Sequence, residues 1–183
     1  MKRLLLLFTL IFFVLSATSS FGFVIRKDGP YEGRVIDADA GKPVEGVVVL
    51  GVWYKEIPSP GGAISQYYDA METVTDKNGE FQIKGLGLLV MSNIIPMDVL
   101  IFKAGYEYES GLWTSLKKYV KKIKWEGDKA IIPLRKLSLE ERKKQGSPDF
   151  SFKIPGNKMK LMLDEINKDR VERGLLPYRI GGK

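Results

Sequence analysis

The sequence predicts an all-β protein, a β-sandwich that is followed by a short helical C-terminal tail. Three observations support this prediction. Short runs of β-favouring residues alternate with Gly-, Pro- and Asp-rich turn clusters between residues 31 and 137. The clearest helix signals, a capping box and an amphipathic stretch, come after residue 137. A hydrophobic content of 44% and a charged content of 28% are typical of a globular chain.

The N-terminus, residues 1–22, has the pattern of a secretory signal peptide. Lys2 and Arg3 precede an apolar run from Leu4 to Leu15, and small residues follow. The run is shorter than the about 20 residues that a membrane-spanning helix needs. We therefore expect cleavage, after either Ser19 or Gly22, and no stable membrane span afterwards; a retained anchor is the alternative. The protein would be exported, periplasmic or extracellular, and residues 23–30 would be an N-terminal linker.

Composition excludes several kinds of chemistry. The 183 residues contain no His and no Cys, so Ser-His-Asp triads, Cys–His nucleophiles, zinc sites with His or Cys ligands, and disulfides are ruled out. Loss of Lys2 and Arg3 would lower the net charge from +7 to +5, a mild excess. We expect no enzyme activity, no cofactor, no metal site and, because the chain is exported, no nucleic-acid partner.

The predicted sandwich begins near residue 31. Strands are expected at 31–38, 44–54, 71–75, 80–84, 97–103 and 129–134. Residues 57–70 are expected to be a loop, since Pro58 and Pro60 interrupt regular structure. Asn78-Gly79 predicts a hairpin turn between the strands that flank it. Pro133 suggests that the last strand lies at a sheet edge.

Four segments, in this order, resemble the carboxypeptidase regulatory-like domain family: Gly33-Arg-Val-Ile-Asp-Ala, Gly41-Lys-Pro-Val-Glu-Gly-Val-Val-Val, Thr75-Asp-Lys-Asn-Gly-Glu-Phe-Gln-Ile and Lys103-Ala-Gly-Tyr106. The resemblance covers residues 31–137. It implies a seven-stranded, transthyretin-like Greek-key β-sandwich and a non-catalytic module of secreted or cell-surface bacterial proteins. The structural turn and core residues that match are Gly33, Gly41, Pro43, Gly46, Asp76, Gly79, Phe81, Gly105 and Tyr106, to which Asn78 is added for the turn.

Residues 108–128 depart from the family pattern, and the sequence leaves helix, strand and loop open for them. The segment is basic, with Lys117, Lys118, Lys121 and Lys122, and Trp113 and Trp125 bracket it. Such a surface would suit an anionic partner, or it would simply face water while the tryptophans pack on the core.

The C-terminal extension, residues 138–183, carries two helix signals. Ser138 and Glu141 form a capping box for a helix over 139–145 that ends at Gly146. A second helix should follow Asn157, with an apolar face formed by Met159, Met162, Leu163 and Ile166. We expect this face to cover the sandwich, with the apolar connection 86–95 as one candidate surface. The alternative is that it binds a partner.

Together these patterns predict a non-catalytic, exported accessory or structural module that mediates protein–protein contacts in the cell envelope. The alternative is a carbohydrate- or peptidoglycan-binding module, so the partner is an envelope protein or a glycan. Exposed Trp53, Tyr54, Tyr67, Tyr68 or Trp113 would provide stacking surfaces for a glycan. The residues singled out as a possible binding surface are Trp53, Tyr54, Trp113, Lys117, Lys118, Lys121 and Lys122.

Overall fold

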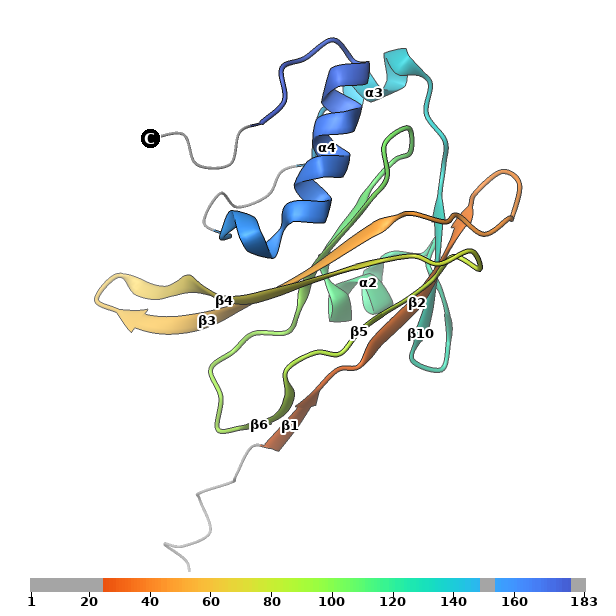
Figure 1. The fold of residues 1–183 in the computed structure, drawn as a ribbon. Coiled ribbons are helices and arrows are strands. Elements are labelled where there is room, and N and C mark those ends of the chain that lie inside the picture. The colour runs from red at the N-terminus through yellow and green to blue at the C-terminus, as the bar shows by residue number, and fades with distance from the viewer. Residues whose placement is uncertain (1–24, 149–153, 179–183) are drawn as a thin grey trace, which may run out of the picture.

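A computed structural model describes residues 25–148 and 154–178. The fold is mainly β, as predicted: two four-stranded sheets enclose a common core, a two-stranded ribbon extends from one end, and the C-terminal helices α3 and α4 lie at the other (Figure 1). One sheet has the order β5-β2-β10-β9, the other has the order β4-β3-β7-β8, and β1 pairs with β6 in the ribbon.

Ten strands are assigned in the described part of the chain, whereas seven were expected. They are β1 (Ile25–Asp28), β2 (Tyr31–Asp37), β3 (Val48–Ser59), β4 (Gly62–Val74), β5 (Glu80–Ile83), β6 (Gly87–Val90), β7 (Asp98–Phe102), β8 (Glu109–Leu112), β9 (Lys124–Glu126) and β10 (Lys129–Leu134). The helices are α2 (Trp113–Tyr119), α3 (Leu139–Gln145), the 3-10 helix η2 (Gly156–Lys158) and α4 (Lys160–Glu172).

The core lies between the two four-stranded sheets. Because successive side chains of a strand point to opposite faces, every second residue of the central strands reaches this core. One sheet contributes Val35, Phe81, Ile83, Ala130, Ile132 and Leu134, and the other contributes Val49, Trp53, Val99 and Ile101. These side chains are all buried, so the sandwich has a continuous apolar interior.

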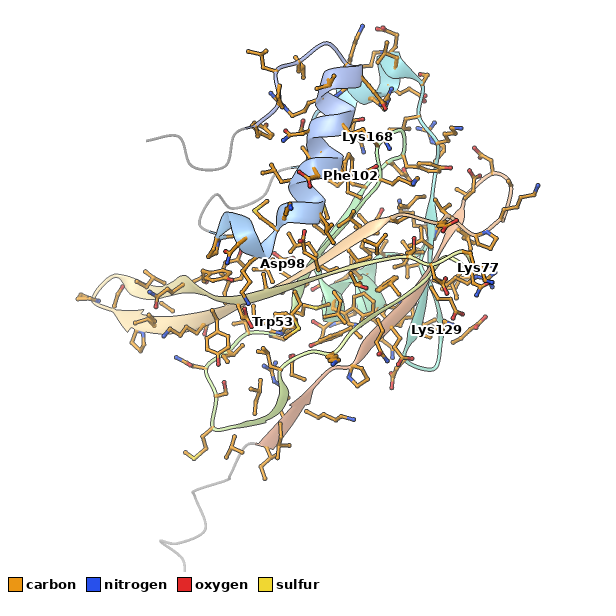
Figure 2. All side chains as sticks on the ribbon, in the orientation of Figure 1. Trp53, Lys77, Asp98, Phe102, Lys129 and Lys168 are labelled. Carbon is orange, nitrogen blue, oxygen red and sulfur yellow. The ribbon has the colours of Figure 1, made fainter. Side chains whose placement is uncertain are left out.

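The outer face of β3 and β7 is also apolar, and α4 covers it. Val48, Leu50, Val52, Leu100 and Phe102 form one cluster with Met159, Met162, Leu163 and Ile166. Figure 2 shows Phe102 beside the middle of α4. This arrangement explains why residues 47–50 are apolar without alternation, since one set packs inside the sandwich and the other under the helix. The predicted covering role of the helix is confirmed, but the surface that it covers is β3 and β7 rather than the connection 86–95.

Polar contacts fix α4 in place. The Glu72 carboxylate accepts hydrogen bonds from the backbone amides of Leu161 (3.0 Å) and Met162 (2.7 Å) in the first turn of the helix. A carboxylate at this position satisfies amides that have no partner within the helix and complements its dipole. Burial raises the pKa of Glu72. The Ala104 amide donates to the Glu165 side chain (2.9 Å), which ties the middle of α4 to the end of β7.

Helix α3 begins and ends as predicted. Ser138 accepts from the Glu141 amide, the Glu141 side chain accepts from the Ser138 amide, and Gly146 ends the helix with a φ of 79°. The start of α4 differs from the prediction, because Asn157 lies inside η2 and the N-cap residue is Met159. Glu72, which lies on β4, supplies the side-chain acceptor that Asn157 was expected to supply.

Three predictions about the strands are wrong. Residues 57–70 are not a loop: β3 continues to Ser59, and β4 starts at Gly62. Residues 23–30 are not only a linker, since they contain β1. The turn at Asn78-Gly79 does not join a hairpin, because β4 pairs with β3 in one sheet and β5 pairs with β2 in the other. It is a corner between the sheets.

The position of Pro133 corrects a fourth prediction. β10 lies between β2 and β9, so it is not an edge strand of its sheet. However, β9 pairs only with residues 129–131, and Pro133 lies beyond its end. A proline is tolerated there because one side of β10 has no β9 partner at that point.

Candidate binding surface

The long hairpin of β3 and β4 is the most prominent surface feature. Its two strands pair from Val48 with Val74 to Ser59 with Gly62, so Pro60 and Gly61 form a two-residue turn. Figure 1 shows the distal half of the hairpin extending beyond the rest of the sandwich. A register shift occurs where the hairpin leaves the core, next to Trp53. Side chains beyond this point are half-buried or exposed.

The two edges of the distal hairpin differ. On the β3 side, the Glu56 amide donates to the Asn93 carbonyl (3.0 Å), and the Ile95 amide donates to the Tyr54 carbonyl (2.9 Å). On the β4 side, no strand of the described residues pairs with the outer edge. An unpaired edge presents backbone N–H and C=O groups to which another extended chain can add.

A cavity of about 580 Å³ opens at the base of this hairpin, on the outer face of its sheet. Its lining includes Val52, Tyr54, Ile95, Asp98, Ser110 and Ile154. Asp98 is the only charged residue of the apolar stretch 97–102, and burial raises its pKa. Figure 2 shows Asp98 on the side of the hairpin that faces α4. The site combines apolar walls with one carboxylate, which suits an apolar side chain or one with a positively charged end.

Trp53 and Trp113 are not exposed, and their prediction as stacking surfaces is therefore wrong. Trp53 is fully buried, and Trp113 is 6% exposed. The Trp113 ring makes edge contacts with Trp125 (5.3 Å between centroids) and Tyr31 (5.6 Å). The two tryptophans fill the core because large aromatic rings bury much apolar area in a small sandwich.

The remaining candidate aromatics lie on the hairpin. Tyr54 and Tyr67 are half-buried beside the cluster under α4, and Tyr68 is 48% exposed at the register shift. With both tryptophans buried, the hairpin presents only tyrosines of the candidate aromatics, and a tyrosine offers both an apolar ring and a polar hydroxyl for contact.

A buried carboxylate that the sequence reasoning missed positions the ribbon. Asp28 is 2% exposed and accepts hydrogen bonds from the Trp53 indole (2.9 Å), the Tyr31 hydroxyl (2.7 Å) and the Leu86 amide (3.0 Å). Burial and the bond to Asp28 raise the pKa of Tyr31. The signal in the sequence was weak, because Asp28 precedes Gly29-Pro30 and resembles an ordinary turn residue.

The segment 108–128 contains β8, α2 and β9. Two of its five lysines are paired with carboxylates: Lys117 with Asp128 (3.0 Å), and Lys122 with Glu107 (3.0 Å) and Glu109. The Lys118 ammonium lies 4.9 Å from the centroid of the Tyr119 ring, and Lys121 is exposed. Neighbouring carboxylates thus neutralise part of the predicted basic surface, which weakens the argument for an anionic partner at this segment.

The predicted turn residues adopt the conformations that their roles require. Gly41, Gly46, Gly79 and Gly105 have φ values of 65°, 73°, 74° and 88°. A Cβ on Gly79 would lie 2.4 Å from the Val35 carbonyl oxygen. The Asp76 side chain accepts from the amides of Asn78 (2.9 Å) and Glu80 (2.8 Å), and the bond from Glu80 lowers its pKa.

The other predicted structural residues lie at contacts between elements. Phe81 is buried across from Gly33, where an added Cβ would lie 2.6 Å from the Phe81 ring. Pro43 pairs with Ile36, and the Tyr106 hydroxyl lies 3.5 Å from the Asp37 carboxylate.

Within residues 25–148 and 154–178, no group of three acidic side chains is placed to hold a metal ion. Among the same residues, no helix is long and apolar enough to cross a membrane. Comparisons of the chain with protein-family models, with curated proteins and with solved structures find no match.

Proposed function

We propose that this protein is a non-catalytic, exported accessory module that mediates protein–protein contacts in the cell envelope. The observation that carries the proposal is the projecting β3–β4 hairpin, whose β4 edge has no strand partner within the described residues. A sandwich of this size does not need a hairpin that extends beyond its core. The extra length is instead well suited to reach another protein.

The hairpin suggests how a partner would bind. An extended segment of the partner adds as a strand along β4, where backbone hydrogen bonds supply affinity. A side chain of the partner enters the cavity at the hairpin base, where the Asp98 carboxylate favours a lysine or arginine with an apolar stem. Backbone pairing is tolerant of sequence, so the cavity provides the selectivity.

We further propose that the sandwich is a transthyretin-like Greek-key domain of the carboxypeptidase regulatory-like family. The residues that carry this resemblance support it. Gly79 occupies a corner where a side chain would meet the Val35 carbonyl, and Gly33 lies under the Phe81 ring. The three strands beyond the expected seven would then be additions to the common sandwich.

The carbohydrate-binding alternative has less support. Two of its five aromatic candidates, Trp53 and Trp113, are buried in the core. Retention of the protein on peptidoglycan or on a polysaccharide matrix, with loss of retention on Tyr68→Ala, would favour this alternative over protein contacts.

Site-specific crosslinking in intact cells tests the proposal. A photoreactive amino acid replaces Ile64, which is 55% exposed near the hairpin tip, and the matched control position is Val171 on α4, which is 58% exposed. We expect discrete adducts with an envelope protein from position 64 and none from position 171. Equal adducts from both positions, or none from position 64, would contradict the proposal.

A further inference from the structure

The ribbon of β1 and β6 carries an exposed apolar surface, which we call the ribbon patch. It consists of Ile25 (60% exposed), Leu88 (67%), Val90 (49%) and Met91 (60%). Ile25 pairs with Val90, and Leu88 lies two residues from Val90, so the three side chains share one face of the ribbon. Met91 follows directly, in a left-handed backbone conformation with a φ of 46°.

The opposite face of the ribbon is fixed to the sandwich. Asp28 is buried against Trp53 and Tyr31, as described above. The Arg26 guanidinium donates to the Ile94 carbonyl (2.7 Å). Because these contacts determine which face turns inward, the apolar face is held outward and cannot fold back onto the core.

Two exposed lysines lie at the ribbon patch, and exposed negative charges are absent from its own strands and from the loop that follows. Lys27 pairs with Leu88 on the face of the patch, and Lys84 lies beside the ribbon, whereas the Arg26 side chain belongs to the opposite face. Residues 84–97 contain no Asp or Glu, and Asp28 is 2% exposed. Glu56 lies farther along, on the strand segment that pairs with Asn93.

The position of the ribbon in the molecule is also informative. The ribbon lies at the end opposite α4 (Figure 1), and the chain enters it from residues 1–24. Residues 16–24 separate the apolar run that ends at Leu15 from Ile25. A stretch of that length spans at most about 30 Å when fully extended. Before the expected cleavage after Ser19 or Gly22, the N-terminal run and the ribbon patch can therefore reach the same bilayer surface.

We propose that the ribbon patch contacts an anionic lipid bilayer and orients the sandwich on the membrane surface. Monomeric proteins rarely leave a contiguous group of large apolar side chains exposed unless it binds something. Apolar residues flanked by Lys and Arg, without acidic residues, are typical of surfaces that enter the lipid headgroup region. Such an orientation places the ribbon at the bilayer and points α4 away from it.

Fluorescence quenching tests the contact in the full chain. The chain has no cysteine, so Leu88→Cys provides a unique site for an environment-sensitive fluorophore, and Val171→Cys provides a matched exposed control on α4. Each protein is added to vesicles of phosphatidylglycerol and phosphatidylethanolamine that contain a spin-labelled lipid. We expect a blue shift and quenching at position 88 and neither effect at position 171. A label at position 88 that stays unquenched would overturn the proposal, whether or not the protein floats with the vesicles.

A second measurement separates the ribbon patch from the N-terminal run. The processed protein, purified after export, is sedimented with the same vesicles and with phosphatidylcholine vesicles. Leu88→Ser with Met91→Ser should weaken binding to the anionic vesicles by on the order of tenfold or more, whereas Leu176→Ser should not. Unchanged binding of the double variant would contradict the proposal. A blue shift of the label at position 88 in the absence of vesicles would also contradict it, because the ribbon patch would then be covered by a second copy of the chain.

Discussion

Replacement of Ile166 by alanine tests whether α4 is an integral layer of the fold. Ile166 is fully buried between α4 and the outer face of β3 and β7. Removal of a buried Ile side chain to Ala typically costs about 2–5 kcal/mol, because apolar contacts are lost and a cavity is left. A domain of this size has only about 5–15 kcal/mol of stability in total. The substitution should therefore lower the urea midpoint clearly.

The matched control is Val171→Ala, a substitution in the same helix at a position that is 58% exposed. It should change the free energy of unfolding by less than about 0.5 kcal/mol. Urea denaturation monitored by tryptophan fluorescence measures both variants, since Trp53 lies in the core. An Ile166→Ala variant that is as stable as Val171→Ala would refute the view that α4 contributes to the core.

Truncation after Pro155 extends the same test. The truncated protein lacks η2 and α4 and would expose the outer face of β3 and β7, including Leu50 and Phe102. We expect lower stability and increased binding of a dye that recognises apolar surface. A truncated protein with unchanged stability and no dye binding would mean that the helix is a detachable docking element.

Three further predictions concern the sandwich and its caps. Gly79→Val should destabilise the protein by about 1–3 kcal/mol in thermal or urea unfolding, since φ is positive and the new Cβ would meet the Val35 carbonyl; an unchanged midpoint would contradict this. Asp28→Ala should cost about 3 kcal/mol or more because three donors lose their acceptor, and Asp28→Asn should cost less; equal costs would show that the hydrogen bonds are not the cause. The bonds from Arg135 and Ser138 lower the pKa of Glu141 to about 2, so the stability that Glu141 contributes is present above about pH 4.5 and is lost as the pH falls toward 2. The difference in unfolding free energy between wild type and Glu141→Gln should therefore shrink between these two pH values. A difference that stays constant with pH would refute the assignment.

Local signals in the sequence predicted the backbone conformation of the Gly79 turn and both caps of α3, although not the N-cap of α4. The positive φ of Gly79 and Gly146 and the capping box of Ser138 and Glu141 follow from interactions within a few residues. Such interactions can be identified without knowledge of the rest of the fold.

Pairing between distant segments was harder to predict. The turn at Gly79 has the expected conformation, but local chemistry does not specify which sheet each flanking strand joins. Likewise, Pro58 and Pro60 favoured a loop. In the structure, Pro58 lies on β3 beyond the segment where Asn93 pairs, and Pro60 lies in the two-residue turn. Both positions tolerate proline because no backbone N–H is needed there for a hydrogen bond to a neighbouring strand.

The candidate site was the least predictable feature. Exposure of Trp53 and Trp113 was inferred from residue type, whereas burial depends on partners far away in the sequence. Trp53, for example, is one of three donors to Asp28, and the cavity beside Asp98 forms only where the hairpin, β7 and Ile154 meet. A lone acid within the apolar stretch 97–102 was the one sequence signal for that cavity.

Shortening the hairpin tests the central claim most directly. Residues 56–65 are replaced by Asn-Gly, which supports a tight two-residue turn between Lys55 and Gln66, since the Glu56 amide faces Asn93 and Lys55 therefore faces Gln66. The removed residues lie outside both apolar clusters, so thermal stability should change little. Quantitative mass spectrometry of crosslinked envelope proteins then compares the shortened and the full-length protein in cells. The account predicts loss of the specific partner with the fold intact, and full retention of that partner by the shortened protein would contradict it.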